Sequence, residues 1–406
     1  MPQFPRISAL RLSLLTLSLA VLSTSVASAA TEIEFYVGNK GVDTWKALFA
    51  AFEKQNPDIK VNLVVPPDFV AVLKTRIVKN KAPDIVAMGG DTNFKGFAEG
   101  GVFKDYAADP ILKTVKPIYV QQLQAIVGGK QVYGIPYTAN TIGLIYNADK
   151  LKALGLTPPK TWDQFVAAMK KAKAAGETPV TLTLKDAWVT LPFMNALAID
   201  LVPADFAAKK NAGTTSFTKA YSPVADKMLT VAQYSQNDPA GTSYPDGTAA
   251  FAKGGSVFYI QGDWALPDIL AANPKVKLGM VPFPTTNGSN RVVSSVDLLL
   301  ATSQSTRHPA EVAKLLAFLT TKANVNTYLK AVNAPSVQVG TVPTDPILSA
   351  MKSSYSSGNI AGAAFNLFPP GLAAETFWQA MLQDKNKQKA LSGLDKTWDD
   401  VVKRSN

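Results

Sequence analysis

The chain has 406 residues, 47% of them apolar, and contains no cysteine. The absence of cysteine excludes disulfides, thiolate metal sites, a cysteine nucleophile and a lipid anchor on an N-terminal cysteine, so a hydrophobic core must hold a chain long enough for two domains. The formal net charge of +11 comes from lysines scattered along predicted helices, without interleaved aromatics, which argues against a nucleic-acid or membrane surface.

The first thirty residues have the pattern of an export signal. Arg6 and Arg11 form a positive region, residues 12–22 form an apolar stretch, and Ala27-Ser28-Ala29 matches a cleavage site. The apolar stretch of roughly eleven residues is shorter than the ~20 that a membrane-spanning helix needs. We therefore expect residues 1–29 to be a cleaved signal peptide, and the mature protein to diffuse freely in a periplasm without a lipid anchor.

Strand and helix patterns alternate over the following stretch of about sixty residues. An amphipathic helix is expected to begin at Asp43 or Thr44, either of which has a side chain suited to capping it. The expected elements are a strand at 32–37, this helix to 55, a strand at 60–65, a basic helix at 70–80 and a strand at 85–88. This order predicts a parallel sheet built from βαβ units.

Further along, residues 133–146 read as two extended runs. Thr161 and Gln164 have the spacing of a capping box, so a helix is expected to begin there. His308 precedes a proline that opens another helix, and helical patterns dominate the C-terminal third. Because no long linker separates these parts, we expect two lobes that are closely joined.

The sequence lacks the residue sets that most catalytic mechanisms require. His308 is the single histidine, which excludes histidine-based triads and, without cysteine, zinc sites. No phosphate-binding, dinucleotide-binding or nucleophile-elbow motif is present. We expect neither an enzyme nor a cofactor or metal. A glycoside hydrolase remains an alternative because its two carboxylates have no fixed spacing, and Asp91, Asp263 and Asp297 are the candidates.

Residues 251–270, FAKGGSVFYIQGDWALPDIL, point to a ligand rather than to catalysis. An apolar strand at 256–260 runs into a turn at Gly262, which presents Asp263 and Trp264. Strand ends of this kind are where α/β proteins place ligand groups, and a tryptophan offers a flat apolar face suited to a sugar ring. The alternative is a core tryptophan behind a loop.

Several segments, taken in order, resemble one family over nearly the whole mature chain. They are KAPDIVAMGGDTNFKGFAEGGVFKDY (81–106), GKQVYGIPYTANTIGLIYNADKL (129–151), PKTWDQFVAAMKKAKAAGETPV (159–180), FAKGGSVFYIQGDWA (251–265), VKLGMVPFP (276–284) and VVSSVDLLLATSQSTRHPAEVAKLLAFL (292–319). Together they resemble the periplasmic solute-binding proteins of ABC importers, in the class that includes maltose-binding protein. The Gly-Asp-Trp turn and the later Ser-Ser-Val-Asp run are most similar to the raffinose and other oligosaccharide-binding branch.

The resemblance implies an α/β fold of two lobes with a ligand cleft between them, crossed by hinge strands. Lobe one would comprise residues 31–137 and 292–340, and lobe two residues 138–291 and 341–406. The crossings would lie near 136–140, 285–291 and 340–343. The resemblance further implies a monomer that captures a di- or oligosaccharide by hinge closure and delivers it to membrane permease subunits.

Carried over residue by residue, the resemblance implies seven residues that contact the sugar. They are Asn39 and Lys40 after the first strand, Asp91 in a loop, Asn140 on the hinge segment, Trp188 in lobe two, Trp264 in the turn and Asp297 on the returning strand. Carboxylates suit such sites because they accept hydrogen bonds from two neighbouring hydroxyls at once. An aromatic from the C-terminal part is also expected, and Phe365, Phe368 and Trp378 are equal candidates.

Each of these assignments has a simpler alternative. Asp91 could merely cap a loop, Trp188 could belong to the core of lobe two, and Lys40 could be a solvated side chain. The ligand could also differ within the same fold. A polyamine would require a ring of acids facing aromatics, and Asp91, Asp263 and Asp297 keep that alternative open. A polyol phosphate would require arginines that the mapped cleft largely lacks, and a metal ion is a third possibility.

Overall fold

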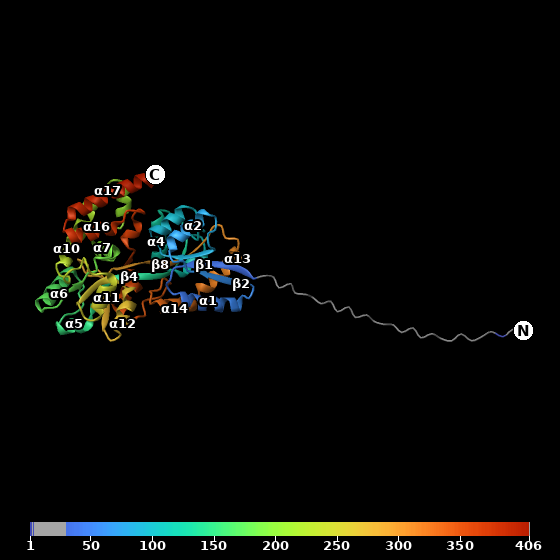
Figure 1. The fold of residues 1–406 in the computed structure, drawn as a ribbon, viewed down its shortest axis with the longest axis horizontal. Coiled ribbons are helices and arrows are strands. Elements are labelled where there is room, and N and C mark those ends of the chain that lie inside the picture. The colour runs from blue at the N-terminus through green and yellow to red at the C-terminus, as the bar shows by residue number, and fades with distance from the viewer. Residues whose placement is uncertain (2, 4–29, 406) are drawn as a thin grey trace.

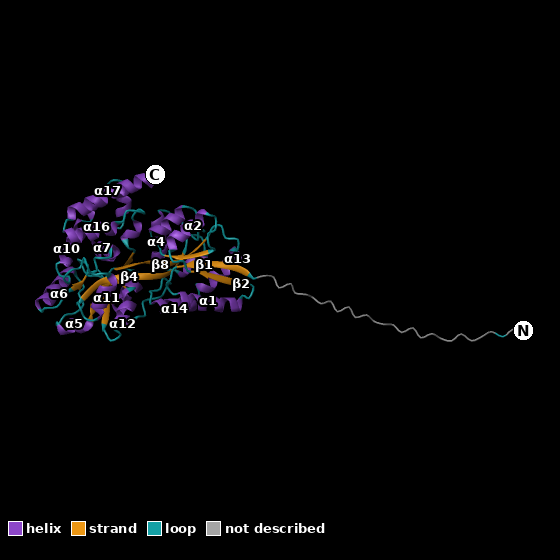
Figure 2. Ribbon diagram, in the orientation of Figure 1, coloured by secondary structure: helices purple, strands orange, loops and turns teal. Residues whose placement is uncertain are grey.

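The computed structural model describes residues 1, 3 and 30–405, and these form a mixed α/β fold around one nine-stranded sheet (Figure 2). The predicted export signal at 1–29 lies almost entirely outside the described residues. In the described part of the chain, no helix combines the length and apolar character needed to cross a bilayer. The strands are β1 (Thr31–Val37), β2 (Ile59–Val64), β3 (Ile85–Met88), β4 (Ile135–Asn147), β5 (Val180–Thr181), β6 (Phe258–Gly262), β7 (Leu278–Val281), β8 (Val292–Thr302) and β9 (Ile360–Ala361).

The strand order is β2-β1-β3-β8-β4-β6-β5, with β7 paired to β4 and β9 paired to β8. β1 pairs in parallel with both β2 and β3, as the predicted βαβ units require. β3 then pairs with β8 in antiparallel fashion, so a strand from late in the chain completes the N-terminal part of the sheet. The carboxyl ends of β1 and β3 consequently open toward the other half of the molecule.

The two long strands β4 and β8 join the halves of the molecule (Figure 1). The first part of β4 pairs with β8 from Ile135 to Ile142, and its last part pairs with β6 and β7. The expectation of two extended runs at 133–146 was therefore wrong, because one continuous strand crosses between the lobes. A bulge between Pro136 and Ala139 lets β4 accommodate its proline, which has no N–H for the ladder.

Helices cover both faces of each half. Around the N-terminal half, α1 and α14 lie on one side of the strands and α2 and α4 on the other (Figure 2). The helices of this half are α1 (Val42–Gln55), α2 (Phe69–Val78), α3 (Thr92–Glu99), η1 (Pro110–Thr114), α4 (Pro117–Val127), α13 (Pro309–Leu319) and α14 (Lys322–Val332).

The other half carries more helices, and α7, α10, α16 and α17 pack together on one side of its strands (Figure 1). Its helices are α5 (Ala148–Ala153), α6 (Trp162–Ala174), η2 (Ala187–Val189), α7 (Thr190–Leu201), α8 (Phe206–Asn211), α9 (Phe217–Ala220), α10 (Ser222–Ala232), α11 (Tyr244–Ala252), α12 (Ala265–Ala272), η3 (Pro346–Met351), α15 (Lys352–Ser357), η4 (Ala364–Leu367), α16 (Ala374–Asp384) and α17 (Lys387–Ser405).

Buried apolar side chains form separate cores in the two halves. Trp45 and Tyr137 belong to the core beneath α1 and α14, whereas Trp378 and Trp398 belong to the core among α7, α16 and α17. Each fully buried large apolar side chain contributes about 1.5–3 kcal/mol, so these cores can hold a chain without disulfides. Along β8, Val293 packs in the second half and Val296 in the first, so the cores meet at the β4–β8 crossing. The exact division of the chain into lobes stays a prediction.

Of three predicted starts of helices and strands, one is confirmed and two differ in the structure. The capping box at Thr161 and Gln164 is confirmed, since both side chains bond the backbone at the start of α6. Helix α1 differs: Gly41 occupies its N-cap position in a left-handed conformation, and neither Asp43 nor Thr44 caps it. A left-handed residue at that position favours glycine over a capping side chain. The strand expected at 256–260 lies two residues later, so Gly262 ends β6.

Candidate ligand-binding site

Lys40 and Asp297 come together at the end of β1. Lys40 lies in the turn between β1 and α1, and its Nζ is 2.7 Å from Oδ2 of Asp297 on β8. The hydroxyl of Thr138 on β4 donates to the same oxygen at 3.5 Å. The two side chains are 47% and 24% exposed, so this ion pair is open to solvent. It places a cation and an anion side by side next to the strand crossing.

Tyr328 of α14 holds this turn in place. Its hydroxyl donates to the carbonyl of Lys40 at 3.3 Å, and its ring stacks near Trp45 with centroids 4.3 Å apart. A Cβ on Gly41 would lie 2.6 Å from the Tyr328 ring, so only glycine fits beneath it. Lys40 is therefore presented by a fixed backbone, while Asn39 beside it is exposed.

Asp91 caps the start of helix α3, a role that was not predicted from the sequence. Its Oδ1 accepts hydrogen bonds from the backbone N–H groups of Asn93 and Phe94 at 2.9 and 3.1 Å. Burial raises the pKa of this carboxyl against the lowering effect of the two N–H donors. Oδ2 lies beside Gly89, whose missing Cβ would also be 3.6 Å from the Asp297 carbonyl oxygen. Asp91 thus lies close to the backbone of Asp297 across the β3–β8 edge.

Asn140 lies at the centre of the crossing. Its side-chain Oδ1 accepts from the backbone N–H of Ser295, and its carbonyl accepts from the hydroxyl of Ser294 at 2.6 Å. Both contacts tie β4 to β8 where the two cores meet. Asn140 is half-buried, so the structure gives it a structural role in addition to the predicted one.

The two predicted tryptophans of the second half lie together. Trp188 is 40% exposed, and its ring centroid is 5.0 Å from that of Tyr244 and 6.5 Å from that of Trp264. The core alternative for Trp188 therefore fails. Trp264 packs directly over Gly262, where a Cβ would lie 2.0 Å from the ring. The three rings form an aromatic group at the ends of β5 and β6.

Asp263 directly precedes Trp264 and interacts electrostatically with both members of the ion pair. Its Oδ1 accepts from the backbone N–H of Thr141 at 3.1 Å, and its own N–H donates to the Thr141 carbonyl at 2.9 Å. Burial raises the pKa of Asp263 to about 8; Asp297 adds to the rise and Lys40 opposes it. The sequence suggested Asp263 as an acid of the alternative hydrolase or of a polyamine site, but not as a contact of the sugar.

A buried hydroxyl network below the crossing was missed entirely from the sequence. The hydroxyls of Tyr119 on α4 and Tyr355 on α15 lie 2.9 and 3.0 Å from the Ser294 hydroxyl. Tyr355 also contacts the hydroxyl of Thr141. No sequence signal relates these residues, because they come from four distant segments. The network links both halves at the strands that join them.

The structure also separates the three C-terminal aromatics. Phe368 and Trp378 are buried in the core of the second half. Phe365 of η4 packs against the same core but is only half-buried. Phe365 is therefore the one of the three that is available for contact.

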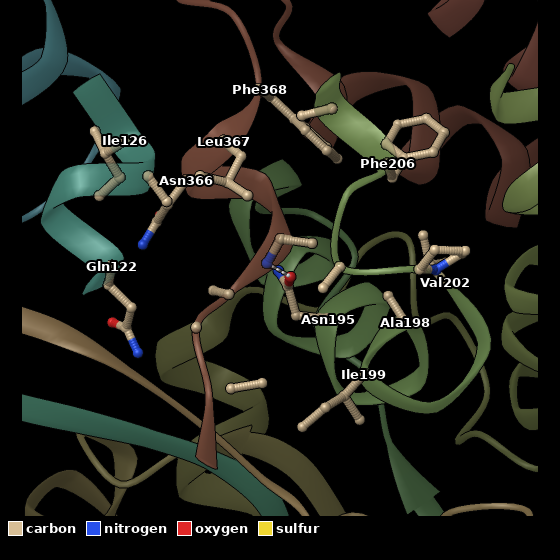
Figure 3. Close-up of a pocket in the computed structure, with 18 of the residues that line it drawn as sticks. Gln122, Ile126, Asn195, Ala198, Ile199, Val202, Phe206, Asn366, Leu367 and Phe368 are labelled. Carbon is tan, nitrogen blue, oxygen red and sulfur yellow. Dashed lines mark hydrogen bonds between the residues drawn. The ribbon is translucent and has the colours of Figure 1, made fainter. Parts of the chain in front are cut away.

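A separate hollow lies between α4 and the second half (Figure 3). Gln122 and Ile126 of α4 line one side, and Ala198 and Ile199 of α7 line the other, with residues 360–368 between them. The amide Oδ1 of Asn195 accepts from the backbone of this segment at residue 364. The seven predicted residues do not line this mostly apolar hollow, so it is distinct from the candidate site.

The chain matches the model of the family described as bacterial extracellular solute-binding protein over residues 38–326. A multiple sugar-binding protein of Streptococcus mutans is 30% identical over 75% of this chain and 74% of its own length. A melibiose/raffinose/stachyose-binding protein of Bacillus subtilis is 27% identical over 72% of this chain and 70% of its own.

Among solved structures, the ligand-free form of RafE from Streptococcus pneumoniae superposes with a TM-score of 0.80. It is 27% identical and covers 92% of this chain and 98% of its own. RafE in complex with raffinose gives a TM-score of 0.77 at 26% identity, over 92% of this chain and 100% of its own. These matches confirm the resemblance that the sequence segments suggested. The chain belongs to the family of bacterial extracellular solute-binding proteins.

Proposed function

We propose that this protein is the substrate-binding component of an ABC importer, and that it captures an oligosaccharide of the raffinose type between its two lobes. The observation that carries the proposal is that polar and aromatic side chains come from opposite halves of the molecule, and that Asp263, next to Trp264, interacts electrostatically with Lys40 and Asp297. Lys40, Asp297 and Asp91 supply polar groups from the N-terminal half, and Trp188 and Trp264 supply aromatic faces from the other half. Hydroxyls and C–H faces of a sugar match those two kinds of surface.

Closure of the lobes around the sugar follows from this division of contacts. Only a closed state lets one solute touch both sets of groups, so the solute favours closure by its extra contacts. The continuous strands β4 and β8 act as the hinge, with lobe one at 31–137 and 292–340 and lobe two at 138–291 and 341–406. Asn39 and Asn140 complete the proposed contacts at the edge and floor of the cleft.

The remaining parts of the proposal concern location and partners. Export through a cleaved signal at 1–29 would deliver a protein without a lipid anchor to the periplasm, consistent with an extracellular family. There it would act as a monomer and dock on permease subunits. The relatives described above are named as binding proteins rather than as enzymes, which favours capture over hydrolysis.

A calorimetric panel tests the proposal. Raffinose, stachyose, melibiose, spermidine and an inositol phosphate are titrated into the mature protein, and small-angle scattering is recorded with and without the best binder. We expect binding of at least one of the three sugars, with a decrease in the radius of gyration on closure. Binding of spermidine or inositol phosphate without any of the three sugars would overturn the proposal.

A further inference from the structure

Asp263 is a buried acid in the second half of the molecule. It directly follows the last residue of β6 and directly precedes Trp264. Both its N–H and its Oδ1 bond the backbone of Thr141 on β4, at 2.9 and 3.1 Å. The carboxyl group is thereby fixed against a hinge strand, one residue from Asn140.

The other carboxyl oxygen of Asp263 is unused. The residue is 3% exposed, and its Oδ2 is buried without a hydrogen-bond partner among the described residues. A buried polar atom left unpaired costs about 1–3 kcal/mol, so an unpaired carboxyl oxygen calls for a specific explanation. Its position next to the Trp264 ring points to a bound solute as the missing partner.

Asp263 has residues of the candidate site among its neighbours. Lys40 and Asp297 act on it electrostatically from the N-terminal half, and the phenols of Tyr119 and Tyr355 approach from α4 and α15. Those two phenols already contact the Ser294 hydroxyl, and Lys40 is held by Asp297. Asp263 therefore has neighbours on both lobes, but its Oδ2 bonds none of them.

We propose that Asp263 is a further binding residue of the cleft, whose Oδ2 forms a hydrogen bond with an oxygen of a neutral, polyhydroxylated solute. This inference rests on the proposed function and narrows its ligand class. A solute whose oxygen bonds Oδ2 of Asp263 would also contact Trp264 and the Lys40–Asp297 pair. A polyamine, which carries only donors and positive charge, lacks such an oxygen.

The protonation state of Asp263 gives the proposal a distinctive signature. Burial raises its pKa to about 8, so the carboxyl is mainly neutral at pH 7 and Oδ2 donates its proton while Oδ1 accepts from Thr141. Above pH 8 the proton is lost, and with it the donor. The affinity for the sugar should then fall, by about tenfold between pH 7 and pH 9 for a single group of this kind.

Calorimetric titration of raffinose from pH 6 to pH 9 tests the assignment. The variants are Asp263→Asn, Asp263→Ala and a control, Asp149→Asn, which removes an exposed acid of the same half. The amide of Asp263→Asn keeps an acceptor for Thr141 and places a permanent N–H donor where Oδ2 was. Lys116→Met is a second control. Lys116 lies over the Tyr355 ring, and burial lowers its pKa to about 8, so it titrates in the same pH range as Asp263.

We expect Asp263→Asn to bind raffinose within about threefold of the wild type at pH 7 and to lose the pH dependence, because its donor does not titrate. Asp263→Ala should bind about tenfold to a hundredfold more weakly. Asp149→Asn and Lys116→Met should keep the wild-type fall above pH 8.

Three results would overturn the inference. Asp263→Ala could bind raffinose as tightly as the wild type and only lower the melting temperature, which would make Asp263 purely structural. Asp263→Asn could lose as much affinity as Asp263→Ala, which would mean that the site requires a carboxylate. A wild type that binds no sugar at all would overturn the proposed function and this inference together, whereas the first two results leave the proposed function intact.

Discussion

Lys40 and Asp297 lie 257 positions apart in the sequence, and their side chains form an ion pair of 2.7 Å between the turn after β1 and the hinge strand β8. The pair joins the turn after β1 to a strand that pairs with both β3 and β4. Since Asp263 of the other half also responds electrostatically to both members, the pair lies near both lobes. We therefore expect the pair to matter more for ligand binding than for the stability of the fold.

The first prediction separates that role from stability. Lys40→Met should weaken raffinose binding on the order of tenfold, because a charge-assisted donor to the sugar is lost. The melting temperature of the free protein should change by no more than about 2–4 °C, since a partly exposed ion pair contributes about 0–1 kcal/mol. Calorimetry and thermal unfolding measure the two effects.

Lys60→Met is the matched control for Lys40→Met. Lys60 and Glu53 form an ion pair of similar length, 2.9 Å, and similar exposure in the same half, but outside the candidate site. This variant should leave the raffinose affinity unchanged. Equal loss of affinity in both variants would contradict a specific role for Lys40.

The second prediction concerns the exposed ring of Trp188. Trp188→Ala should weaken raffinose binding on the order of tenfold, because a stacking face is worth about 0.5–1.5 kcal/mol beyond its buried area. Trp188→Phe should retain part of the affinity, as it keeps a smaller ring. Trp162→Ala, which removes a half-buried tryptophan at the start of α6, serves as control and should lower only the melting temperature. Unchanged affinity in Trp188→Ala would remove Trp188 from the site.

Much of the fold was predictable because it depends on short-range patterns. The strands β1 to β3 and their helices follow from apolar periodicity, and the capping box of α6 follows from two residues three apart. The single strand β4 was not predictable in the same way. Gly134 and Pro136 are local signals for a break, and only pairing with β8 and a bulge at the proline keep the strand continuous.

The sequence suggested individual residues of the candidate site, but not the contacts between them. The resemblance indicated Lys40 and Asp297 separately, but their ion pair depends on the packing of β1 beside β3 and β8. The link between Asp263 and Thr141 spans 122 positions, so no local pattern could reveal it. Among the C-terminal aromatics, only tertiary burial distinguished Phe365 from Phe368 and Trp378.

The third prediction uses the close approach of Trp264 to Gly262. Gly262→Ala should weaken raffinose binding at least tenfold, because the new Cβ would lie 2.0 Å from the ring and must displace it. The melting temperature should also fall, since overpacking costs about 1–3 kcal/mol. Gly96→Ala is the control: its Cβ meets no atom within 4 Å inside α3, so stability should be unchanged or higher. Wild-type affinity in Gly262→Ala would show that the ring position does not matter.

The fourth prediction concerns Lys116, a buried lysine that donates hydrogen bonds to two uncharged groups. Lys116 bonds the Ser336 carbonyl and the Thr341 hydroxyl at 3.3 and 3.4 Å, and burial lowers its pKa to about 8. In the unfolded chain its pKa is near 10.4, so between pH 8 and that value the unfolded state binds more protons than the folded state. Lys116 therefore makes the folded state more stable as the pH rises through this window, and the gain is lost as the pH falls through 8.

Lys116→Met should remove this contribution, so the melting temperature of the variant should rise less between pH 8 and pH 10 than that of the wild type. The expected difference is on the order of a few degrees. Thermal unfolding by circular dichroism at half-unit pH intervals measures it. Lys74→Met, which removes an exposed lysine of α2, is the control and should follow the wild-type curve. Parallel curves for Lys116→Met and the wild type would mean that Lys116 is hydrated in solution and that the hinge carries no buried cation.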